Sequence, residues 1–435
     1  MPHSRGMRRL LTLLTLLVAA LAVLGLSPTP AEAATGPNAI TTFTTTGIGS
    51  PKSLVSGPDG NLWFVSPLGD RIGRITPGGA ITLYSNANVD GPNDITVGPD
   101  GYLWFTSTSN NRIGKINPAN GAITTYPTGV AGPARPDSIV AGNDGHLWFT
   151  LDTNGAVQDD DQVGESTTAG AITMYQSTNI DSPRDIVAGP DGNLWFTSLS
   201  NDAVVKVTTG GAITPYTNAT HINAPQGITV GPDNALWVTS LYNDKVVRMT
   251  ITGTVTNGFT HPEMNSPQDI TTGPDGRLWI TSEGFPDRII RMATNGGQVG
   301  TFNSSATVVD PQGIVEGPDD NVWFTSGGKI ARLSIPRCSG IIATVLRGPD
   351  GFGAPTAGSD VIVGTQGPDT INAGLGNDGV CGLGGADKLF GQGGGDNLVG
   401  GLGADRLDGG PANDECFGGP GVDVGISCEN QVGIP

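Results

Sequence analysis

Residues 92–107 read PNDITVGPDGYLWFTS, and two further short runs follow them, RIGKI at 112–116 and AITTY at 122–126. The Pro-Asp-Gly sequence suits a tight turn, because proline fixes φ at the second position of the turn. The Leu-Trp-Phe-Thr run after it alternates as a half-buried strand does. The whole unit therefore predicts four short strands joined by turns.

Variants of this unit fill most of the chain, and each carries one tryptophan. The tryptophans are 41 to 47 residues apart, which is the period of a four-stranded propeller blade. They are Trp63, Trp104, Trp148, Trp195, Trp237, Trp279 and Trp323. The fold class is therefore all-β, with a seven-bladed β-propeller over residues 34–335. We expect the tryptophans to pack between blades and not to form a platform for sugars.

The last blade lacks one strand. Nothing like AITTY follows KIARL at 329–333, whereas AITTF stands alone at 39–43, before the first blade. An incomplete last blade would leave an exposed sheet edge at the seam of the ring. We therefore expect residues 39–43 to pair with the last blade and to close the ring.

The blade signature GPDGxLWFT, followed by RIGRI at 71–75, resembles that of the virginiamycin B lyase family. The resemblance covers roughly residues 37–335. It implies a seven-bladed propeller, magnesium as the cofactor, and ring opening of streptogramin B antibiotics by elimination.

The positions that this resemblance assigns to catalysis are altered. Gln268 and Gln312 stand where the family has its catalytic histidines, each directly after the proline that opens a blade. Asp310 and Gly327 stand at the positions of the metal-binding glutamates, and Lys52 stands at that of an aromatic residue. Because an amide cannot act as a general base, we expect no catalytic residue here, and magnesium only if lyase chemistry persists.

A second set of residues points to the centre of the propeller. Asp94, Asp185 and Asp269 occupy the third position of the opening turn in three blades. They could bring three carboxylates to one rim of the pore as a cation site, or each could cap its own turn. The acidic run 159–161 lies in the longest interval between tryptophans and is expected to be a solvated loop.

Aspartates recur every nine residues in the C-terminal fifth of the chain, in runs such as GGLGAD at 400–405. They are Asp360, Asp369, Asp378, Asp387, Asp396, Asp405, Asp414 and Asp423, and an apolar residue stands two positions after most of them. The pattern resembles the RTX, or hemolysin-type, calcium-binding nonapeptide repeat, which forms a parallel β-roll. We expect a roll of about four coils over 358–435, with a C-terminal cap.

The resemblance makes these eight aspartates the candidate ligands of several calcium ions, because calcium takes hard oxygen ligands. The end turns lack some glycines and are expected to bind weakly or to act as caps. Two other readings remain open at this point: a flexible glycine-rich linker, and a solenoid that needs no calcium.

The first 33 residues have the features of a secretory signal peptide. Arginines precede an apolar run at 10–26, and Ala31-Glu32-Ala33 supplies a small-x-small cleavage site. An uncleaved anchor is the competing reading, and no later stretch is long and apolar enough to span a bilayer. Removal of the leader takes away three arginines and one glutamate, so the net charge falls from −18 to about −20. Such a surface repels nucleic acid.

All four cysteines follow the propeller region, at Cys338, Cys381, Cys416 and Cys428. An even count in an exported chain suggests two disulfides, for which three pairings exist. We favour Cys416–Cys428, which would pin the end of the roll, and Cys338–Cys381. Residues 336–357 are expected to be a linker.

The sequence therefore indicates a secreted, extracellular calcium-binding protein. Its propeller is expected to bind an unidentified small molecule or cell-surface ligand without lyase chemistry. The alternative is a divalent-metal-dependent lyase, similar to virginiamycin B lyase, or a hydrolase with a rearranged site. A third reading makes the propeller a plain scaffold.

Overall fold

The computed structural model describes residues 39–153, 161–297, 300–303, 307–335, 337–338, 341–342, 345–346 and 355–434. This part of the chain is built from strands, with short 3-10 helices at η1 (Pro67–Gly69), η2 (Thr108–Asn110) and η3 (Leu241–Asn243) and no α-helix. Within the same residues, no helix has the length and apolar content to cross a membrane. The expected signal peptide, 1–33, lies outside the described residues.

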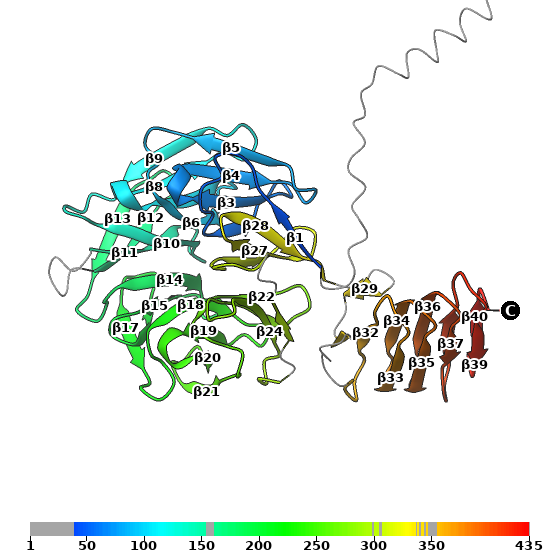
Figure 1. Ribbon diagram of the computed structural model, residues 1–435. Helices are drawn as coiled ribbons and strands as arrows, with labels where there is room; N and C mark the ends of the chain where they lie inside the picture. Colours follow the sequence, from blue (N-terminus) through cyan, green and yellow to red (C-terminus); the bar gives the residue numbers. More distant parts are fainter. Residues whose placement is uncertain are drawn as a thin grey trace, which may run out of the picture. The chain divides into compact units, whose positions relative to one another are not determined.

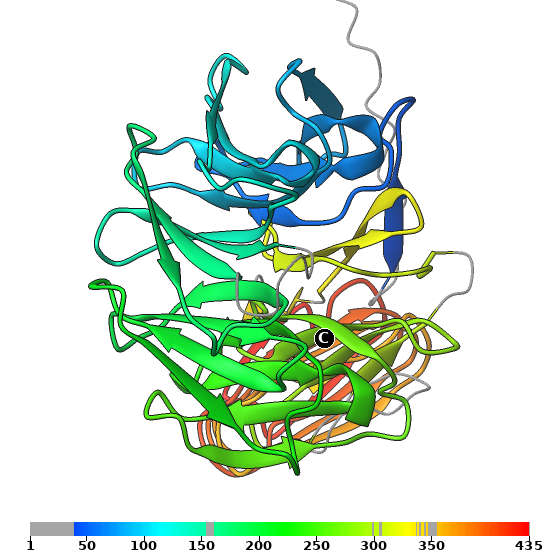
Figure 2. The same cartoon turned by 90° about the vertical axis from the view of Figure 1, so that its left-hand side faces the viewer.

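Seven four-stranded antiparallel sheets are arranged around a common centre as the blades of a propeller (Figures 1 and 2). Blade one is β2 (Leu54–Ser56), β3 (Leu62–Ser66), β4 (Arg71–Ile75) and β5 (Ile81–Ser85). Blade two is β6 (Pro92–Val97), β7 (Leu103–Ser107), β8 (Arg112–Ile116) and β9 (Ile123–Pro127). Blade three is β10 (Arg135–Ala141), β11 (Leu147–Asp152), β12 (Gln162–Ser166) and β13 (Ile172–Gln176). Blade four is β14 (Pro183–Ala188), β15 (Leu194–Ser198), β16 (Ala203–Val207) and β17 (Ile213–Thr217).

The remaining blades repeat this order, and the seven-bladed fold expected from the tryptophan spacing is confirmed. Blade five is β18 (Pro225–Val230), β19 (Leu236–Ser240), β20 (Lys245–Met249) and β21 (Val255–Phe259). Blade six is β22 (Pro267–Thr272), β23 (Leu278–Ser282), β24 (Arg288–Met292) and β25 (Gly300–Phe302). Blade seven combines β26 (Ile314–Glu316), β27 (Val322–Ser326) and β28 (Lys329–Leu333) with β1 (Ile40–Phe43) from the start of the chain.

The tryptophans form the core, as expected. All seven are fully buried, and Trp63 packs with Leu103 and Phe105 of the next blade. Each indole also stacks on an aromatic ring of the fourth strand of its own blade, with centroids 5.3 to 5.7 Å apart. Each blade therefore presents a two-ring wall to its neighbour, which explains why one tryptophan per blade recurs.

Strand β1 closes the ring, as the unpaired AITTF run predicted. It pairs antiparallel with β28, from Ile40 opposite Leu333 to Phe43 opposite Ile330, and the blue β1 lies beside the yellow β28 in Figure 1. The Phe43 ring stacks on Trp323 at 5.3 Å. On its other side it meets Gly79 of blade one, which has φ of +89° and no room for a Cβ. The N-terminal strand thus joins blade seven to blade one.

The C-terminal residues form a parallel β-roll of about four coils, also as expected. One sheet has the order β31-β32-β34-β36-β38-β40 and the other β33-β35-β37-β39. Partners in neighbouring coils of the regular part are 18 residues apart, as Ile371 and Leu389 are. The first sheet holds β31 (Val345–Leu346), β32 (Val361–Val363), β34 (Gly379–Gly384), β36 (Asn397–Leu402), β38 (Glu415–Phe417) and β40 (Asn430–Val432). The second holds β33 (Thr370–Leu375), β35 (Lys388–Gly393), β37 (Arg406–Asp408) and β39 (Val424–Ile426).

Two facing files of apolar side chains fill the roll, one from each sheet, because one residue of each nonapeptide points inward. They are Ile362, Ile371, Val380, Leu389, Leu398, Leu407 and Cys416, and none is exposed. The favoured disulfides, Cys338–Cys381 and Cys416–Cys428, are both present. Strand β31 lies within the segment expected to be a linker, where β29 (Arg337–Cys338) and β30 (Ile341–Ile342) also pair with each other.

Asp161 differs from its expected role in a solvated loop. It is buried, and it accepts hydrogen bonds from the backbone N–H of Thr153 at 2.7 Å and of Ser182 at 2.6 Å. Asp202 makes the equivalent bond to Ala224 in the next blade. The end of the acidic run is therefore a structural bridge between blades, whereas residues 159 and 160 lie outside the described residues.

Candidate functional site

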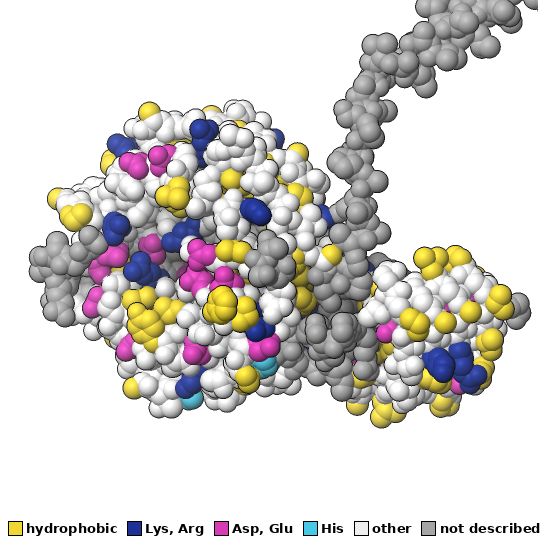
Figure 3. Space-filling model, viewed as in Figure 1, with side chains coloured by type: hydrophobic (Ala, Val, Ile, Leu, Met, Phe, Trp, Pro, Cys, Tyr) yellow, Lys and Arg dark blue, Asp and Glu magenta, His cyan; other side chains and the backbone are white. Residues whose placement is uncertain are grey.

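The propeller has a cavity of about 340 Å³ at one end of its centre, and the first strands of the blades line it. The residue after the opening proline of each blade contributes to an outer ring: Lys52, Asn93, Asp137, Arg184, Gln226, Gln268 and Gln312. The next residue contributes to an inner ring: Ser53, Asp94, Ser138, Asp185, Gly227, Asp269 and Gly313. We call this cavity the channel mouth. In Figure 3, acidic and basic side chains gather around the hollow of the propeller surface.

The three inner-ring aspartates meet at the channel mouth, but their oxygens are used for structure. Asp185 accepts one N–H from Ile186 of its own blade and another from Ile228 of the next blade, at 2.9 and 2.8 Å. Asp94 and Asp269 bridge successive blades in the same way. Burial raises the pKa of all three, that of Asp269 to about 7. The capping role left open by the sequence is therefore observed, in a form that spans two blades.

Glu283 lies between the two glutamines that the sequence singled out. Its Oε2 accepts a hydrogen bond from Gln268 Nε2 at 3.0 Å, and its Oε1 accepts one from Gln312 Nε2 at 3.4 Å. Burial, and then the nearby charge of Asp310, raise the pKa of Glu283 to about 7. The channel mouth thus contains a carboxyl group that titrates near neutral pH, held by two amides.

Sequence reasoning missed Glu283, although a signal was present. It follows Trp279 by four residues, the same offset at which Gly327 follows Trp323 one blade later. Of the other singled-out positions, Lys52 lines the mouth and bonds Asn93 at 2.7 Å. Neither Gly327 nor any of the three histidines in the described part of the chain lines it.

The eight aspartates of the roll form two ladders, in which each rung is 18 residues from the next. In the first ladder the backbone N–H of Asp378 donates to Asp396 Oδ1 at 2.8 Å, and that of Asp396 donates to Asp414 Oδ1 at 2.7 Å. The second ladder contains Asp369, Asp387, Asp405 and Asp423. Glu429 accepts from the N–H of Asp414 and so ends the first ladder, a role that sequence reasoning missed because Glu429 is out of register.

The other oxygen of most rungs has no protein partner. Oδ2 is buried and without a hydrogen bond in Asp378, Asp387, Asp396, Asp405, Asp414 and Asp423. A Cβ on Gly391 would collide both with Asp396 Oδ2 and with the carbonyl oxygen of Gly409 in the next coil. The glycines therefore keep open a space flanked by carboxylate and carbonyl oxygens, the donor set that calcium prefers.

The first two rungs are different. Thr356 donates its backbone N–H and its hydroxyl to Asp360 Oδ2, at 2.6 and 2.9 Å. Thr365 does the same for Asp369. Burial raises the pKa of Asp387 and Asp396, which lie inside the roll, to about 6. The six later rungs, Asp378 to Asp423, thus hold oxygen atoms that a cation would satisfy, whereas threonines bond the first two.

Comparison with known proteins separates the same two regions. The sequence model of the virginiamycin B lyase family matches residues 33–176 and 155–343, and that of the RTX calcium-binding nonapeptide repeat matches 356–389 and 390–424. No curated protein sequence matches the chain.

Solved structures agree. A catalytically inactive virginiamycin B lyase from Staphylococcus aureus, crystallised with quinupristin, is 29% identical over 68% of this chain and 99% of its own, with a TM-score of 0.62. A streptogramin B lyase is 30% identical over 68% of this chain and 98% of its own, with a TM-score of 0.61. The WD40 propeller domain of Doa1, 11% identical with a TM-score of 0.54 over 70% of this chain and 98% of its own, shares the fold alone. The chain belongs to the virginiamycin B lyase family and carries RTX calcium-binding repeats after the propeller in its sequence.

Proposed function

We propose that this chain is an exported calcium-binding protein whose propeller binds a small polar ligand without the elimination chemistry of its family. The observation that carries the proposal is the pair Gln268 and Gln312, which stands where the resemblance places catalytic histidines. An amide does not titrate in the working pH range, so neither residue can act as a general base. Asp310 and Gly327 likewise leave the expected pair of metal-binding glutamates incomplete.

The shape and lining of the channel mouth support a binding role. Its volume of about 340 Å³ falls in the range of small-molecule sites. Four amide side chains of the outer ring offer both donors and acceptors, and Lys52 and Arg184 add positive charge. This lining suits a polar molecule rich in carbonyl or hydroxyl groups, such as a short peptide or a sugar, either free or displayed on a cell surface.

The roll supports the calcium half of the proposal. The eight ladder aspartates are the proposed ligands, and the six with an unpaired Oδ2 are the principal ones. Glycine carbonyl oxygens of the next coil would complete each set. Bound calcium would neutralise carboxylates that repel one another within each ladder. Because the carboxylates are ionised at neutral pH and only a cation then removes the repulsion, folding of the roll at that pH should depend on calcium.

Export from the cell is consistent with both parts of the proposal, the ligand-binding propeller and the calcium-binding roll. Residues 1–33 read as a signal peptide, two disulfides suit an oxidising compartment, and weak calcium sites fill at extracellular concentrations.

Glu283 favours the alternative, a lyase or hydrolase with a rearranged site. A carboxyl group with a pKa of about 7 can accept or donate a proton at neutral pH. Asp310 and Asp287 lie close enough to act on its pKa. In this reading Glu283 would be the general base, and magnesium would supply electrostatic stabilisation beside these carboxylates.

The test is to incubate the chain without residues 1–33 with a streptogramin B antibiotic and magnesium, and to follow ring opening by mass spectrometry. We expect no turnover above that of heat-unfolded protein. The matched variants are Glu283→Gln in the mouth and Glu316→Gln, a partly buried glutamate that does not line it.

Turnover that needs magnesium, is lost in Glu283→Gln and persists in Glu316→Gln would overturn the binding proposal in favour of the rearranged lyase. Absence of turnover, together with binding of a peptide or sugar that Gln268→Ala and Gln312→Ala weaken, would support it.

A further inference from the structure

One position of the blade repeat carries a positive charge in six blades and a negative charge in blade three. The residue that pairs with the tryptophan across the second and third strands is Arg74, Lys115, Lys206, Arg248, Arg291 and Arg332 in blades one, two, four, five, six and seven. In blade three it is Glu165, opposite Trp148.

In five of the six regular blades this cation forms an ion pair with one aspartate. The aspartate of the turn before the tryptophan accepts the indole N–H, and its carboxylate faces the basic side chain. Lys115 lies 3.0 Å from Asp100, and Arg248 lies 2.7 Å from Asp233. Lys206 has no such short contact; hydrogen bonds from Asn193 and Trp195 lower the pKa of Asp191 against its burial, and the charge of Lys206 adds a smaller lowering effect. Each site therefore combines one carboxylate with one cation, and blade six adds a second cation, Arg277.

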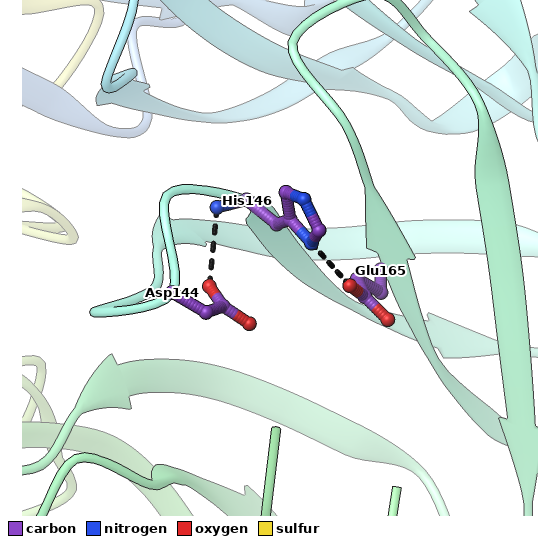
Figure 4. Close-up of side chains that lie close together, drawn as sticks. All are labelled: Asp144, His146 and Glu165. Atoms are coloured by element: carbon purple, nitrogen blue, oxygen red, sulfur yellow. Dashed lines mark hydrogen bonds and ion pairs between the residues drawn. The ribbon is translucent and has the colours of Figure 1, made fainter. Parts of the chain in front are cut away.

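Blade three keeps the anion and lacks that cation. Asp144 accepts the Trp148 indole N–H at 3.0 Å, as its counterparts do, yet Glu165 adds a second carboxylate. His146 also differs from the other blades, which have Asn61, Tyr102, Asn193, Ala235, Arg277 and Asn321 at this position. Its Nδ1 contacts Glu165 Oε1, and Figure 4 shows the imidazole and the two carboxylates on one side of the β10–β11 turn.

The three side chains have the spacing of metal ligands. One ligand atom from each of Asp144, His146 and Glu165 lies within 4.8 Å of the others. The site is open to solvent, since Asp144 is exposed and the other two are half-buried, so water can fill the remaining coordination positions.

Each carboxylate also accepts a hydrogen bond from an aromatic side chain. The Tyr175 hydroxyl donates to Glu165 Oε2 at 2.8 Å, while Oε1 faces His146. The Trp148 indole N–H donates to Asp144 Oδ2, and the Tyr175 ring stacks on the Trp148 ring. Such outer hydrogen bonds orient the ligands of a metal and support its affinity.

We propose that Asp144, His146 and Glu165 form a binding site for a divalent transition metal of the zinc type, which takes the place of the lysine or arginine of the other blades. With a neutral imidazole the cluster carries two negative charges, whereas the regular blades carry none or, in blade six with Arg277 and Arg291, one positive charge. The mixed nitrogen and oxygen ligands select zinc, copper or nickel over calcium and magnesium, which prefer oxygen alone. The site lies at the opposite end of the β10–β11 hairpin from Pro136 and Asp137, so it is separate from the channel mouth.

The experiment uses the chain without residues 1–33 in excess calcium, which occupies the roll. Zinc binding is measured by isothermal titration calorimetry, and cobalt absorption reports a nitrogen ligand. Glu165→Lys and His146→Asn introduce residues that other blades already use at these positions, so both variants should fold. The reciprocal variant, Asn193→His with Lys206→Glu, builds the cluster on Asp191 of blade four.

We expect one zinc ion at this site in the parent protein, an affinity at least about tenfold lower in Glu165→Lys and in His146→Asn, and one additional zinc in the blade-four variant. Zinc should also raise the melting temperature of the parent and not that of Glu165→Lys. Equal zinc stoichiometry and affinity in the parent and Glu165→Lys would overturn the proposal and leave an imidazolium–carboxylate pair as the substitute for the missing cation.

Discussion

Deletion of residues 34–46 should destabilise the propeller by about 3 kcal/mol, because it removes β1 from blade seven. Burial of a large apolar side chain contributes about 1.5–3 kcal/mol when complete, so the half-buried Ile40 and Phe43 contribute about 1 kcal/mol each. The stack of Phe43 on Trp323 adds about 1 kcal/mol. The hydrogen bonds of a four-residue strand are roughly offset by the cost of ordering its backbone.

This loss converts to a shift of about 5 °C in melting temperature. A propeller of about 300 residues has an unfolding entropy of roughly 0.6 kcal/mol/K, if the ring unfolds as one unit. The newly exposed edge of β28 should also promote association of the chains. Calorimetry with size-exclusion chromatography measures both effects.

A synthetic peptide of residues 39–46 should restore the melting temperature, and the same peptide with Phe43→Ala should restore less of it. A truncated chain that stays monomeric and melts within about 1 °C of the parent would refute the reasoning, since β28 would then need no partner.

Three further outcomes are expected in the roll. Without calcium the stability of the roll should fall as the pH rises through about 6, because burial raises the folded-state pKa of Asp396 to that value. With saturating calcium the carboxylates stay ionised in the folded roll, so its stability should change little across that range and fall only below about pH 4, where unfolded aspartates take up protons. Urea unfolding with the same pH dependence in both conditions would contradict this. Asp396→Ala should raise the calcium concentration needed to fold the roll more than Asp360→Ala does, because the Oδ2 of Asp360 is already bonded to a threonine. Circular dichroism during a calcium titration measures this concentration, and an equal effect of the two changes would argue against the assigned ligands. Leu398→Ala should lower the free energy of unfolding in urea by about 2–5 kcal/mol, because Leu398 is buried. Leu402→Ala should leave it almost unchanged, because Leu402 is 60% exposed. The reverse order would disprove the register.

Much of the fold could be predicted from the sequence because both regions are repeats. One tryptophan per blade and one aspartate per nine residues fix the period, and a fixed period fixes which side chains point inward. The ring closure followed from counting strands, and the disulfides followed from the inward position of Cys416. These inferences depend only on local register, which the sequence displays directly.

The site was harder to predict, because it depends on which residues of different blades meet. Glu283 is informative only once Gln268 and Gln312 are known to lie on either side of it. Asp161 was misjudged because an acidic run resembles a solvated loop until its amide partner Ser182, from the next blade, is seen. The inner-ring aspartates left two roles open, since capping and cation binding use the same atoms.

The pairing of β1 with β28 also sets the order in which the ring can fold. Phe43 and Ile330 are adjacent in space and belong to opposite ends of the propeller sequence. Closing a flexible chain of nearly 300 residues costs roughly 5 kcal/mol by the logarithmic loop rule. This cost exceeds the stabilisation of about 3 kcal/mol that β1 provides, so the contact between β1 and β28 cannot nucleate folding. The blades must form first and bring the two ends together, and the earliest strand to emerge during synthesis is the last to find its place.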